Sequence, residues 1–256
     1  MTDVVVTEVS GGVMTIRMNR PDKRNALNRA SYTGLADAMD QAAADPAIRV
    51  VVLSGAGGHF TSGNDIADFQ AGDNSPGERP VGRFLRIIST YPKPIIAAVS
   101  GVAVGVGTTM LLHCDIVYAD ETARLVLPFV NLGLVPEAAS SLTLPKVVGM
   151  ARASEMLLFG EALGAADAER YGIVNRVVKA GELDALVADR AAKLARQPAG
   201  AVRQTKQLLR YATTATVPER MAEEGALFAA ALTSPESQEA MMAFMEKRAP
   251  DFSRFA

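Results

Sequence analysis

Two glycines, Gly105 and Gly107, stand between an apolar run at Ile95–Val99 and an uncharged run at Thr108–Cys114. This pattern predicts a strand, a glycine turn and a buried helix. The first N–H groups of such a helix have no acceptor inside it, and glycine lets a ligand atom approach them closely. Residues 100–144 therefore contain a candidate anion site.

The anion need not be a phosphate. A dinucleotide-binding fingerprint would need a third glycine or alanine after Gly105-Val106-Gly107, where residues 108–110 read Thr-Thr-Met. A phosphate-binding loop would need Gly-Lys-Ser/Thr, which the chain lacks. Taken alone, the glycines equally suit a helix that only packs closely against its neighbours.

A second glycine turn, Gly58–Ile66, follows a predicted strand at Arg49–Ser54. With it, three segments occur in order, and they read NRPDKRNAL (Asn19–Leu27), FTSGNDI (Phe60–Ile66) and SGVAVGVGTTMLLHCDIVYAD (Ser100–Asp120). Together they resemble the enoyl-CoA hydratase/isomerase, or crotonase, superfamily over nearly the whole chain. Three ordered motifs are more specific than any one of them.

The resemblance implies an acyl-CoA substrate whose thioester oxygen becomes an enolate oxygen held by two backbone N–H groups, those of Ser62 and Val106. Donors of this kind act where negative charge develops, and losing one typically costs about 10²–10³ in rate. Coenzyme A is then part of the substrate, and no separate cofactor is expected. The resemblance also implies substrate-binding positions at Lys23, Arg24, Ala26, Gly63, Asn64, Asp65, Ile66, Gly105, Thr109, Phe129 and Leu134. Asp65 is also expected to cap a helix that begins at Ile66.

The positions of the catalytic carboxylates separate the branches of this family. Its hydratases use two glutamates, and the matching positions here are Thr109 and Phe129. Threonine is no general base near neutral pH, and phenylalanine carries no transferable proton. The two-glutamate hydratase mechanism is therefore not supported.

One acid, Glu137, remains near these motifs. As a structural residue, it would follow Pro136 in the first turn of a helix, where proline and an acid are both favoured. As a functional residue, it resembles the single catalytic glutamate of the isomerase branch, which occurs as P-E-G-x-S-S. Ala138 departs from that pattern, because it replaces the usual glycine.

One carboxylate suffices for an isomerase. Moving a double bond from C3–C4 to C2–C3 needs a base that removes a C2 proton and returns it to C4, while two N–H groups hold the enolate. We therefore expect a 3-enoyl-CoA to 2-enoyl-CoA isomerase that uses Glu137. The alternatives are a hydratase that uses Glu137 and water, another crotonase-family reaction, and a non-catalytic acyl-CoA-binding protein. Desolvation is expected to raise the pKa of Glu137, through its apolar neighbours Leu132, Leu134 and Val135.

The 256-residue chain is 49% hydrophobic, which is enough for a sizeable core, and its net charge is −2. Such a charge gives no general attraction to nucleic acid or to an anionic membrane, so basic residues must meet an anionic ligand locally. The resemblance places Lys23 and Arg24 near CoA. It also places a C-terminal pair, Lys247 and Arg248, near the CoA phosphates.

The lone cysteine, Cys114, excludes an internal disulfide, and two histidines make no recognisable metal cluster. A reducing, cytoplasmic location fits this composition. No apolar run reaches the ~18–20 residues of a membrane span, and no secretory leader is recognisable at the N-terminus.

The elements that would position these residues follow from periodicity and turn signals. We expect a hairpin of Val4–Val9 and Val13–Met18, a helix at Arg29–Ala43 capped by Asn28, and a loop at Gln70–Arg79. A second helix is expected at Val81–Thr90. The repeated order of strands followed by a helix matches the α/β spiral of ββα units that the resemblance implies.

The character of the chain changes towards its C-terminus. Residues 1–195 are expected to form the spiral core with the acyl-CoA site, and residues 196–256 a helical oligomerisation region. The resemblance implies a homotrimer or a dimer of trimers. From Glu182 onward no convincing strand is present, and the predicted helices are Leu183–Arg196, Gly200–Tyr211, Pro218–Leu232 and Pro235–Lys247.

Overall fold

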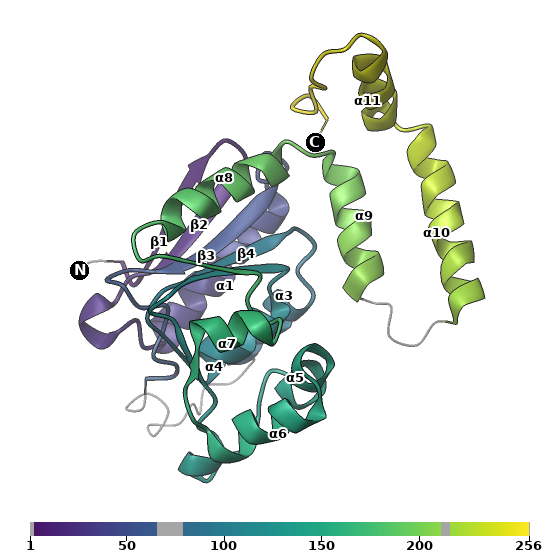
Figure 1. The fold of residues 1–256 in the computed structure, drawn as a ribbon. Coiled ribbons are helices and arrows are strands. Elements are labelled where there is room, and N and C mark those ends of the chain that lie inside the picture. The colour runs from purple at the N-terminus through teal and green to yellow at the C-terminus, as the bar shows by residue number, and fades with distance from the viewer. Residues whose placement is uncertain (1–2, 66–78, 211–215, 256) are drawn as a thin grey trace.

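The computed structural model describes residues 3–65, 79–210 and 216–255, and its centre is a six-stranded sheet (Figure 1). β1 and β2 pair antiparallel, which confirms the predicted hairpin, and every later neighbour in this sheet is parallel. In spatial order the strands are β1 (Val5–Ser10), β2 (Val13–Met18), β3 (Val50–Gly55), β4 (Ile95–Val99), β6 (Ile116–Asp120) and β9 (Arg176–Val178).

The central strands β3 and β4 are apolar and almost entirely buried, because helices cover both faces of the sheet. Alternate residues serve two cores. Val51 and Leu53 belong to the larger one, which includes α1 (Arg29–Ala44) and α3 (Pro80–Ser89). Val50 and Val52 belong to the smaller one, under α8 (Leu183–Ala195) (Figure 1).

A second, three-stranded sheet extends the fold next to the glycine turns. It consists of β5 (Val102–Val104), β7 (Arg124–Val126) and β8 (Leu163–Gly164). Together the two sheets and their helices confirm the predicted α/β architecture. The remaining elements of this part are the 3-10 helices η1 (Pro21–Lys23), η2 (Met110–His113) and η3 (Val130–Leu132), and the helices α4 (Val106–Thr109), α5 (Ser140–Val148), α6 (Met150–Phe159) and α7 (Ala165–Arg170).

Helix α1 is held at both ends by side chains. Asn28 Oδ1 accepts the Ser31 N–H at 2.9 Å, which confirms the predicted N-cap. At the other end, Lys93 Nζ donates to the carbonyl oxygens of Ala42 (2.5 Å) and Asp45 (2.6 Å). This ammonium satisfies carbonyls that have no partner inside the helix, and α1 is thereby fixed against the sheet.

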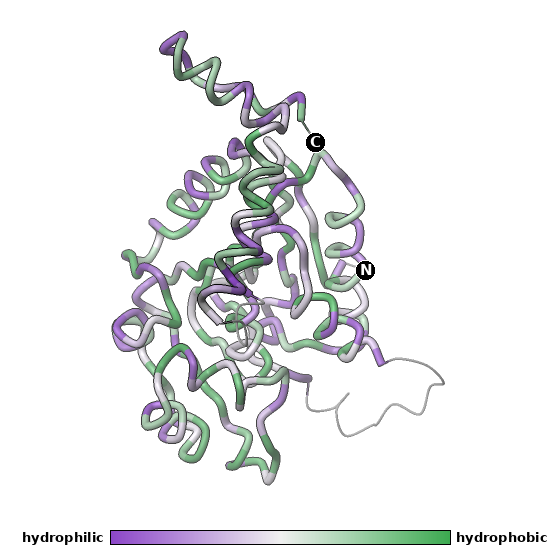
Figure 2. Tube along the Cα trace, turned by 90° about the vertical axis from the view of Figure 1, so that its right-hand side faces the viewer, coloured by the Kyte–Doolittle hydropathy of each residue, from purple (hydrophilic) through white to green (hydrophobic). Residues whose placement is uncertain are grey.

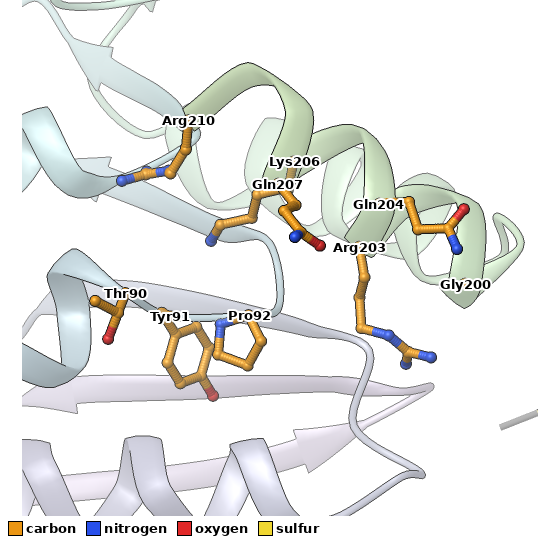
Figure 3. A pocket seen from close by; sticks show the side chains of 9 residues that line it. All are labelled: Thr90, Tyr91, Pro92, Gly200, Arg203, Gln204, Lys206, Gln207 and Arg210. Atoms are coloured by element: carbon orange, nitrogen blue, oxygen red, sulfur yellow. The ribbon is translucent and has the colours of Figure 1, made fainter. Parts of the chain in front are cut away.

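The C-terminal part contains α9 (Ala199–Arg210), α10 (Val217–Leu232) and α11 (Pro235–Met245), and the part that the structure describes has no strand after Val178. These helices project away from the sheets (Figure 1). Polar contacts attach α9: Lys206 Nζ donates to Asp115 Oδ2 (2.8 Å) and Lys93 O (2.6 Å), and Arg210 pairs with Asp115 Oδ1 (3.2 Å). Beside them, a groove of about 450 Å³ separates α9 from the Thr90–Pro92 segment (Figure 3).

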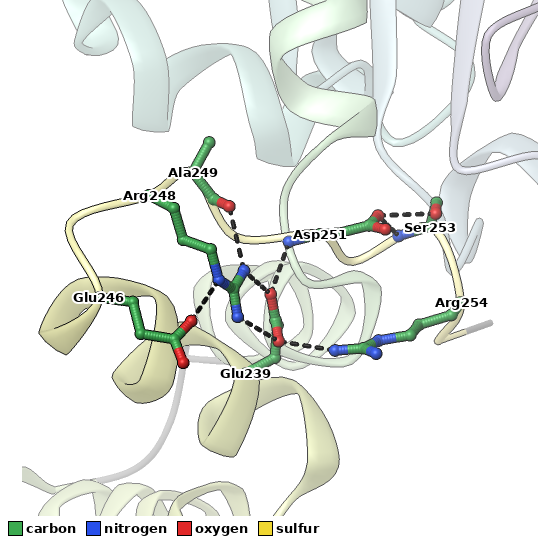
Figure 4. A network of polar contacts seen from close by, with 7 residues as sticks. All are labelled: Glu239, Glu246, Arg248, Ala249, Asp251, Ser253 and Arg254. Atoms are coloured by element: carbon green, nitrogen blue, oxygen red, sulfur yellow. Dashed lines mark hydrogen bonds and ion pairs between the residues drawn. The ribbon is translucent and has the colours of Figure 1, made fainter.

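The C-terminal tail folds back onto α11 through one carboxylate (Figure 4). Glu239 is 2% exposed and accepts from Arg248 (2.6 Å), Arg254 (2.6 Å) and the Asp251 N–H (2.9 Å). These donors lower the pKa of Glu239 to about 2. Arg248 also pairs with Glu246, so its guanidinium is engaged within the tail, which does not support the expectation that it meets CoA phosphates.

The projecting helices expose large apolar side chains, and hydrophobic residues recur along them in the rotated view (Figure 2). Phe244 is 84% exposed, Leu209 75% and Phe228 66%. Monomeric proteins rarely leave so much apolar surface on adjoining elements. Across the described ranges, no helix has the length and hydropathy to span a bilayer. The loop predicted at Gln70–Arg79 lies almost wholly outside the described residues.

Candidate active site

The two glycine turns of the motifs lie against each other. Thr61 forms a parallel bridge with Ala103, and the Val104 N–H donates to Thr61 O at 3.0 Å. The contact leaves no room for side chains: a Cβ on Gly63 would lie 2.6 Å from Val104 O, and one on Gly107 2.6 Å from Thr61 Cγ2. Both glycines are therefore required for the turns to meet.

Sequence reasoning chose the wrong donor in the first turn. The Ser62 N–H donates to Arg24 O at 2.9 Å, and the Ser62 hydroxyl donates to Lys23 O at 3.1 Å. Both groups are used to join this turn to the segment after β2. The Ser62 N–H is therefore not free to bind a substrate oxygen, and that expectation is corrected.

Two residues further on, the Asn64 N–H donates to no acceptor within residues 3–65, 79–210 and 216–255. The side chain of Asn64 is fixed instead, because its Oδ1 accepts the hydroxyl proton of Tyr32 from α1. In the second turn, Gly105 adopts φ 55° and ψ −115°, which presents Val106 as the first residue of α4. Its N–H has no acceptor inside the helix, so Asn64 and Val106 form the better-supported pair.

The segment after β2 runs alongside the first turn. The Leu27 N–H donates to Gly63 O (2.8 Å), and the Asp65 N–H donates to Leu27 O (2.9 Å). Lys23 and Arg24 have exposed side chains there, and no salt bridge to either is found in the described part of the chain. Both residues lie next to the turn, and their contact with CoA stays a prediction.

Asp65 forms an ion pair with Arg20 at 2.9 Å, and Arg20 also donates to Ala26 O at 2.6 Å. This arrangement ties the end of the first turn to the same segment. The helix that Asp65 was expected to cap, and Ile66 itself, lie outside the described residues.

Glu137 lies in a loop ahead of α5, not in the first turn of a helix as its structural alternative assumed. The next two residues, Ala138 (φ 49°) and Ala139 (φ 54°), are left-handed. Glycine adopts this conformation without the cost that an L side chain incurs. The glycine that the isomerase pattern has at residue 138 is thereby explained, and alanine there is strained.

Several hydrogen bonds hold this loop in place. Glu137 O accepts the Ser140 N–H (2.9 Å) and the Ser140 hydroxyl (2.7 Å). His113 Nε2, from η2, lies 2.8 Å from Ala138 O. The Thr109 hydroxyl donates to Glu137 Oε1 at 2.5 Å, and Thr109 is the last residue of the helix that begins at Val106. One helical turn therefore joins the carboxylate to the candidate oxyanion donor.

Burial raises the pKa of Glu137, and the hydrogen bond from Thr109 opposes that rise. The rise was predicted, but the neighbours expected to cause it are exposed: Leu132 by 64%, Leu134 by 41% and Val135 by 79%. Desolvation must come mainly from other groups, and Tyr32 lies close enough that the Glu137 charge helps raise the pKa of its hydroxyl. A carboxylate with a raised pKa is a stronger base once it is ionised.

Phe129 packs in the larger core with 7% exposure, and its carbonyl accepts the Leu134 N–H at 2.8 Å. This placement explains how an apolar residue is accommodated at the second position where hydratases carry a glutamate. Substrate contact by Phe129 or Leu134 stays a prediction. Among the described residues, no group of three metal-ligating side chains occurs.

Comparison with known proteins agrees with this geometry. Residues 8–254 match the family model described as Enoyl-CoA hydratase/isomerase. The 1,2-epoxyphenylacetyl-CoA isomerase of Escherichia coli K12 is 35% identical, and the match covers 99% of both chains. Enoyl-CoA delta isomerase 2 of Rattus norvegicus is 34% identical over 96% of this chain, which spans 64% of the rat protein.

The fold comparison gives the same result. A solved structure of a candidate enoyl-CoA hydratase/carnithine racemase from Magnetospirillum magneticum AMB-1 has a TM-score of 0.95 and 41% identity. The match covers 99% of this chain and 100% of the other. The adjoining glycine turns and the half-buried glutamate are thus found in a chain that, by sequence and by fold, belongs to the enoyl-CoA hydratase/isomerase (crotonase) family of acyl-CoA enzymes.

Proposed function

We propose that this enzyme isomerises 3-enoyl-CoA to 2-enoyl-CoA in fatty-acid or related acyl-CoA metabolism. The observation that carries the proposal is the hydrogen bond from Thr109 to Glu137, which joins a single half-buried carboxylate to the helix that begins at Val106. The two positions at which hydratases carry glutamates hold Thr109 and Phe129. An isomerase needs only one base, since the proton removed from C2 can be returned to C4.

The proposed mechanism assigns the other tasks to backbone groups. The Asn64 and Val106 N–H groups would donate to the thioester oxygen and stabilise the enolate. Glu137 removes the C2 proton, and the C2–H electron pair forms the enolate. Glu137 then returns the proton to C4, which takes it with the electron pair of the C3–C4 double bond, while the enolate re-forms the thioester carbonyl and its C1–C2 pair becomes the C2–C3 double bond. Exposed Lys23 and Arg24 are proposed to bind the CoA phosphates.

The first experiment tests the base. Glu137→Gln preserves the shape of the side chain and removes its basicity, so exchange of the C2 protons of hexanoyl-CoA in deuterated water should be lost while hexanoyl-CoA still binds. The wild-type enzyme is the matched control at equal occupancy. Unchanged exchange would refute the assignment of Glu137, and loss of binding would show that the substitution disturbs more than the base.

The wild-type enzyme of this experiment also decides between isomerase and hydratase. With 3-hexenoyl-CoA and 2-hexenoyl-CoA offered separately, we expect migration of the double bond to be much faster than hydration. Efficient formation of 3-hydroxyhexanoyl-CoA from the 2-enoyl substrate would instead identify a hydratase that uses Glu137 and water.

We also propose that the enzyme is a homotrimer or a dimer of trimers. Phe228, Phe244 and Met245 expose large apolar areas on the projecting α10 and α11, and a subunit contact would remove that surface from water. The proposed location is the cytoplasm, which fits a chain with one free cysteine, Cys114.

A further inference from the structure

Thr109 offers Glu137 a fixed donor. Its side chain is completely buried (0% exposed), and its hydroxyl lies 2.5 Å from Glu137 Oε1 but 3.4 Å from Val106 O. A hydroxyl has one proton, so the shorter contact takes it. Threonine is branched at Cβ, which restricts the rotation that would turn the hydroxyl away.

The two oxygens of the Glu137 carboxylate are therefore not equivalent. Oε1 accepts from Thr109, whereas Oε2 accepts no hydrogen bond from the part of the chain that the structure describes. The last torsion of a glutamate side chain is broad, so an untethered carboxylate would exchange its two oxygens readily. The backbone of the loop is already held by Ser140 at Glu137 O and by His113 at Ala138 O, so the Thr109 hydroxyl acts on the side chain of Glu137 and not on the course of the loop.

We infer that Thr109 is a positioning residue for the base: it holds Oε1 of Glu137 against α4 and leaves Oε2 to carry the proton between C2 and C4. This inference rests on the proposed function. It gives a task to a side chain that occupies the position of a hydratase glutamate but cannot itself move a proton.

The same contact predicts how the reaction depends on pH. Glu137 is active when ionised, so the rate rises as pH increases through its pKa. Burial raises that pKa and the Thr109 bond opposes the rise, so removal of the hydroxyl must shift the rise in rate to higher pH. Two other titratable groups face this loop: burial raises the pKa of the Tyr32 hydroxyl and lowers the pKa of His113, so Tyr32 is harder to ionise and His113 is harder to protonate than the free side chains.

The test compares Thr109→Val, which keeps the shape, with Thr109→Ser, which keeps the hydroxyl. The measured quantity is the rate of C2 proton exchange of hexanoyl-CoA in deuterated water between about pH 5 and pH 9. For Thr109→Val we expect the midpoint of the acidic limb to rise by about one pH unit, the lower end expected for a hydrogen bond to a charged group. The plateau rate should fall about tenfold, since the base is less well oriented.

Thr109→Ser should keep the wild-type midpoint and most of the wild-type plateau rate. A Thr109→Val profile that superimposes on the wild type would overturn the inference. So would a plateau loss with an unmoved midpoint, because that result indicates damage to the Val106 N–H alone. If thermal unfolding shows that Thr109→Val folds poorly, Thr109→Ala replaces it. The difference in midpoint and plateau rate between Thr109→Ala and Thr109→Ser then measures the effect of the hydroxyl, and the same two results would overturn the inference.

Glu137→Gln separates this inference from the proposal beneath it. Exchange that persists in Glu137→Gln refutes the base and the role of Thr109 together. Exchange that is lost in Glu137→Gln but has a normal pH profile in Thr109→Val refutes only the role of Thr109.

Discussion

The contact between the two glycine turns can be tested at Gly63. This residue has φ +87°, and an added Cβ would lie 2.6 Å from Val104 O, a backbone atom that cannot rotate away. Real Cβ atoms essentially never approach closer than 3.0 Å. Gly63→Ala must therefore separate the turns by at least 0.4 Å, the difference between 2.6 Å and 3.0 Å.

Two costs add in this variant. An L residue in a left-handed conformation costs about 1–2 kcal/mol, and forcing extra volume into a packed contact costs about 1–3 kcal/mol. Each kcal/mol lowers the melting temperature of a chain of this size by roughly 2–4 °C. Catalytic groups need placement within about 0.5 Å, so the separation should also lower the exchange rate about tenfold or more.

Gly58→Ala is the matched control. Gly58 has a similar φ of +76°, but its added Cβ would meet nothing within 4 Å. It should show the conformational cost alone, a fall of roughly 2–8 °C, and normal C2 exchange per folded molecule. Thermal unfolding and hexanoyl-CoA exchange measure both effects. Equal losses in the two variants would refute the reasoning, because the clash with Val104 would then add nothing to the strain.

Two further predictions concern the C-terminal part. The pKa of Glu239 lies at about 2, below its unfolded value of about 4.3, so its stabilisation is present above about pH 4.3 and is lost as pH falls towards 2. Glu239→Gln should release the tail at neutral pH and speed tryptic cleavage after Arg248. The control Glu246→Gln removes only an exposed partner of Arg248 and should leave the cleavage rate unchanged. Equal cleavage of the two variants would contradict this prediction. Light scattering at micromolar concentration should give three or six times 27.0 kDa, and Phe244→Glu should lower that mass, whereas an active wild-type monomer would contradict the proposed assembly.

Local signals in the sequence predicted much of the fold. Asn28 identified the start of α1, and the two apolar runs on either side of the Ser10–Gly12 turn identified the hairpin, because caps and turns depend on neighbouring residues. The four predicted C-terminal helices are present, with ends within one or two residues. Each of these features is determined by residues only a few positions apart in the chain.

The details of the site depend on contacts between distant segments, which the sequence does not reveal. Whether Ser62 or Asn64 keeps a free N–H depends on the Arg24 carbonyl, which reaches the turn from the segment after β2. Likewise, no local pattern shows that α9 is attached through an ion pair between Lys206 and Asp115, because these two residues lie 91 positions apart in the chain. Spacing identified the correct turns and helices but not the partners of their polar atoms.

The loop that carries Glu137 shows why these partners matter for function. Ala138 and Ala139 both adopt left-handed conformations that cost about 1–2 kcal/mol per residue. Such strain persists only where the surroundings hold it. Here the Ser140 hydroxyl binds Glu137 O and His113 binds Ala138 O. A regular helix through this segment would avoid the strain, but it would bring the carboxylate into a different position. The strained loop is therefore best understood as the condition for bringing Glu137 to the Thr109 hydroxyl, one helical turn from the Val106 N–H.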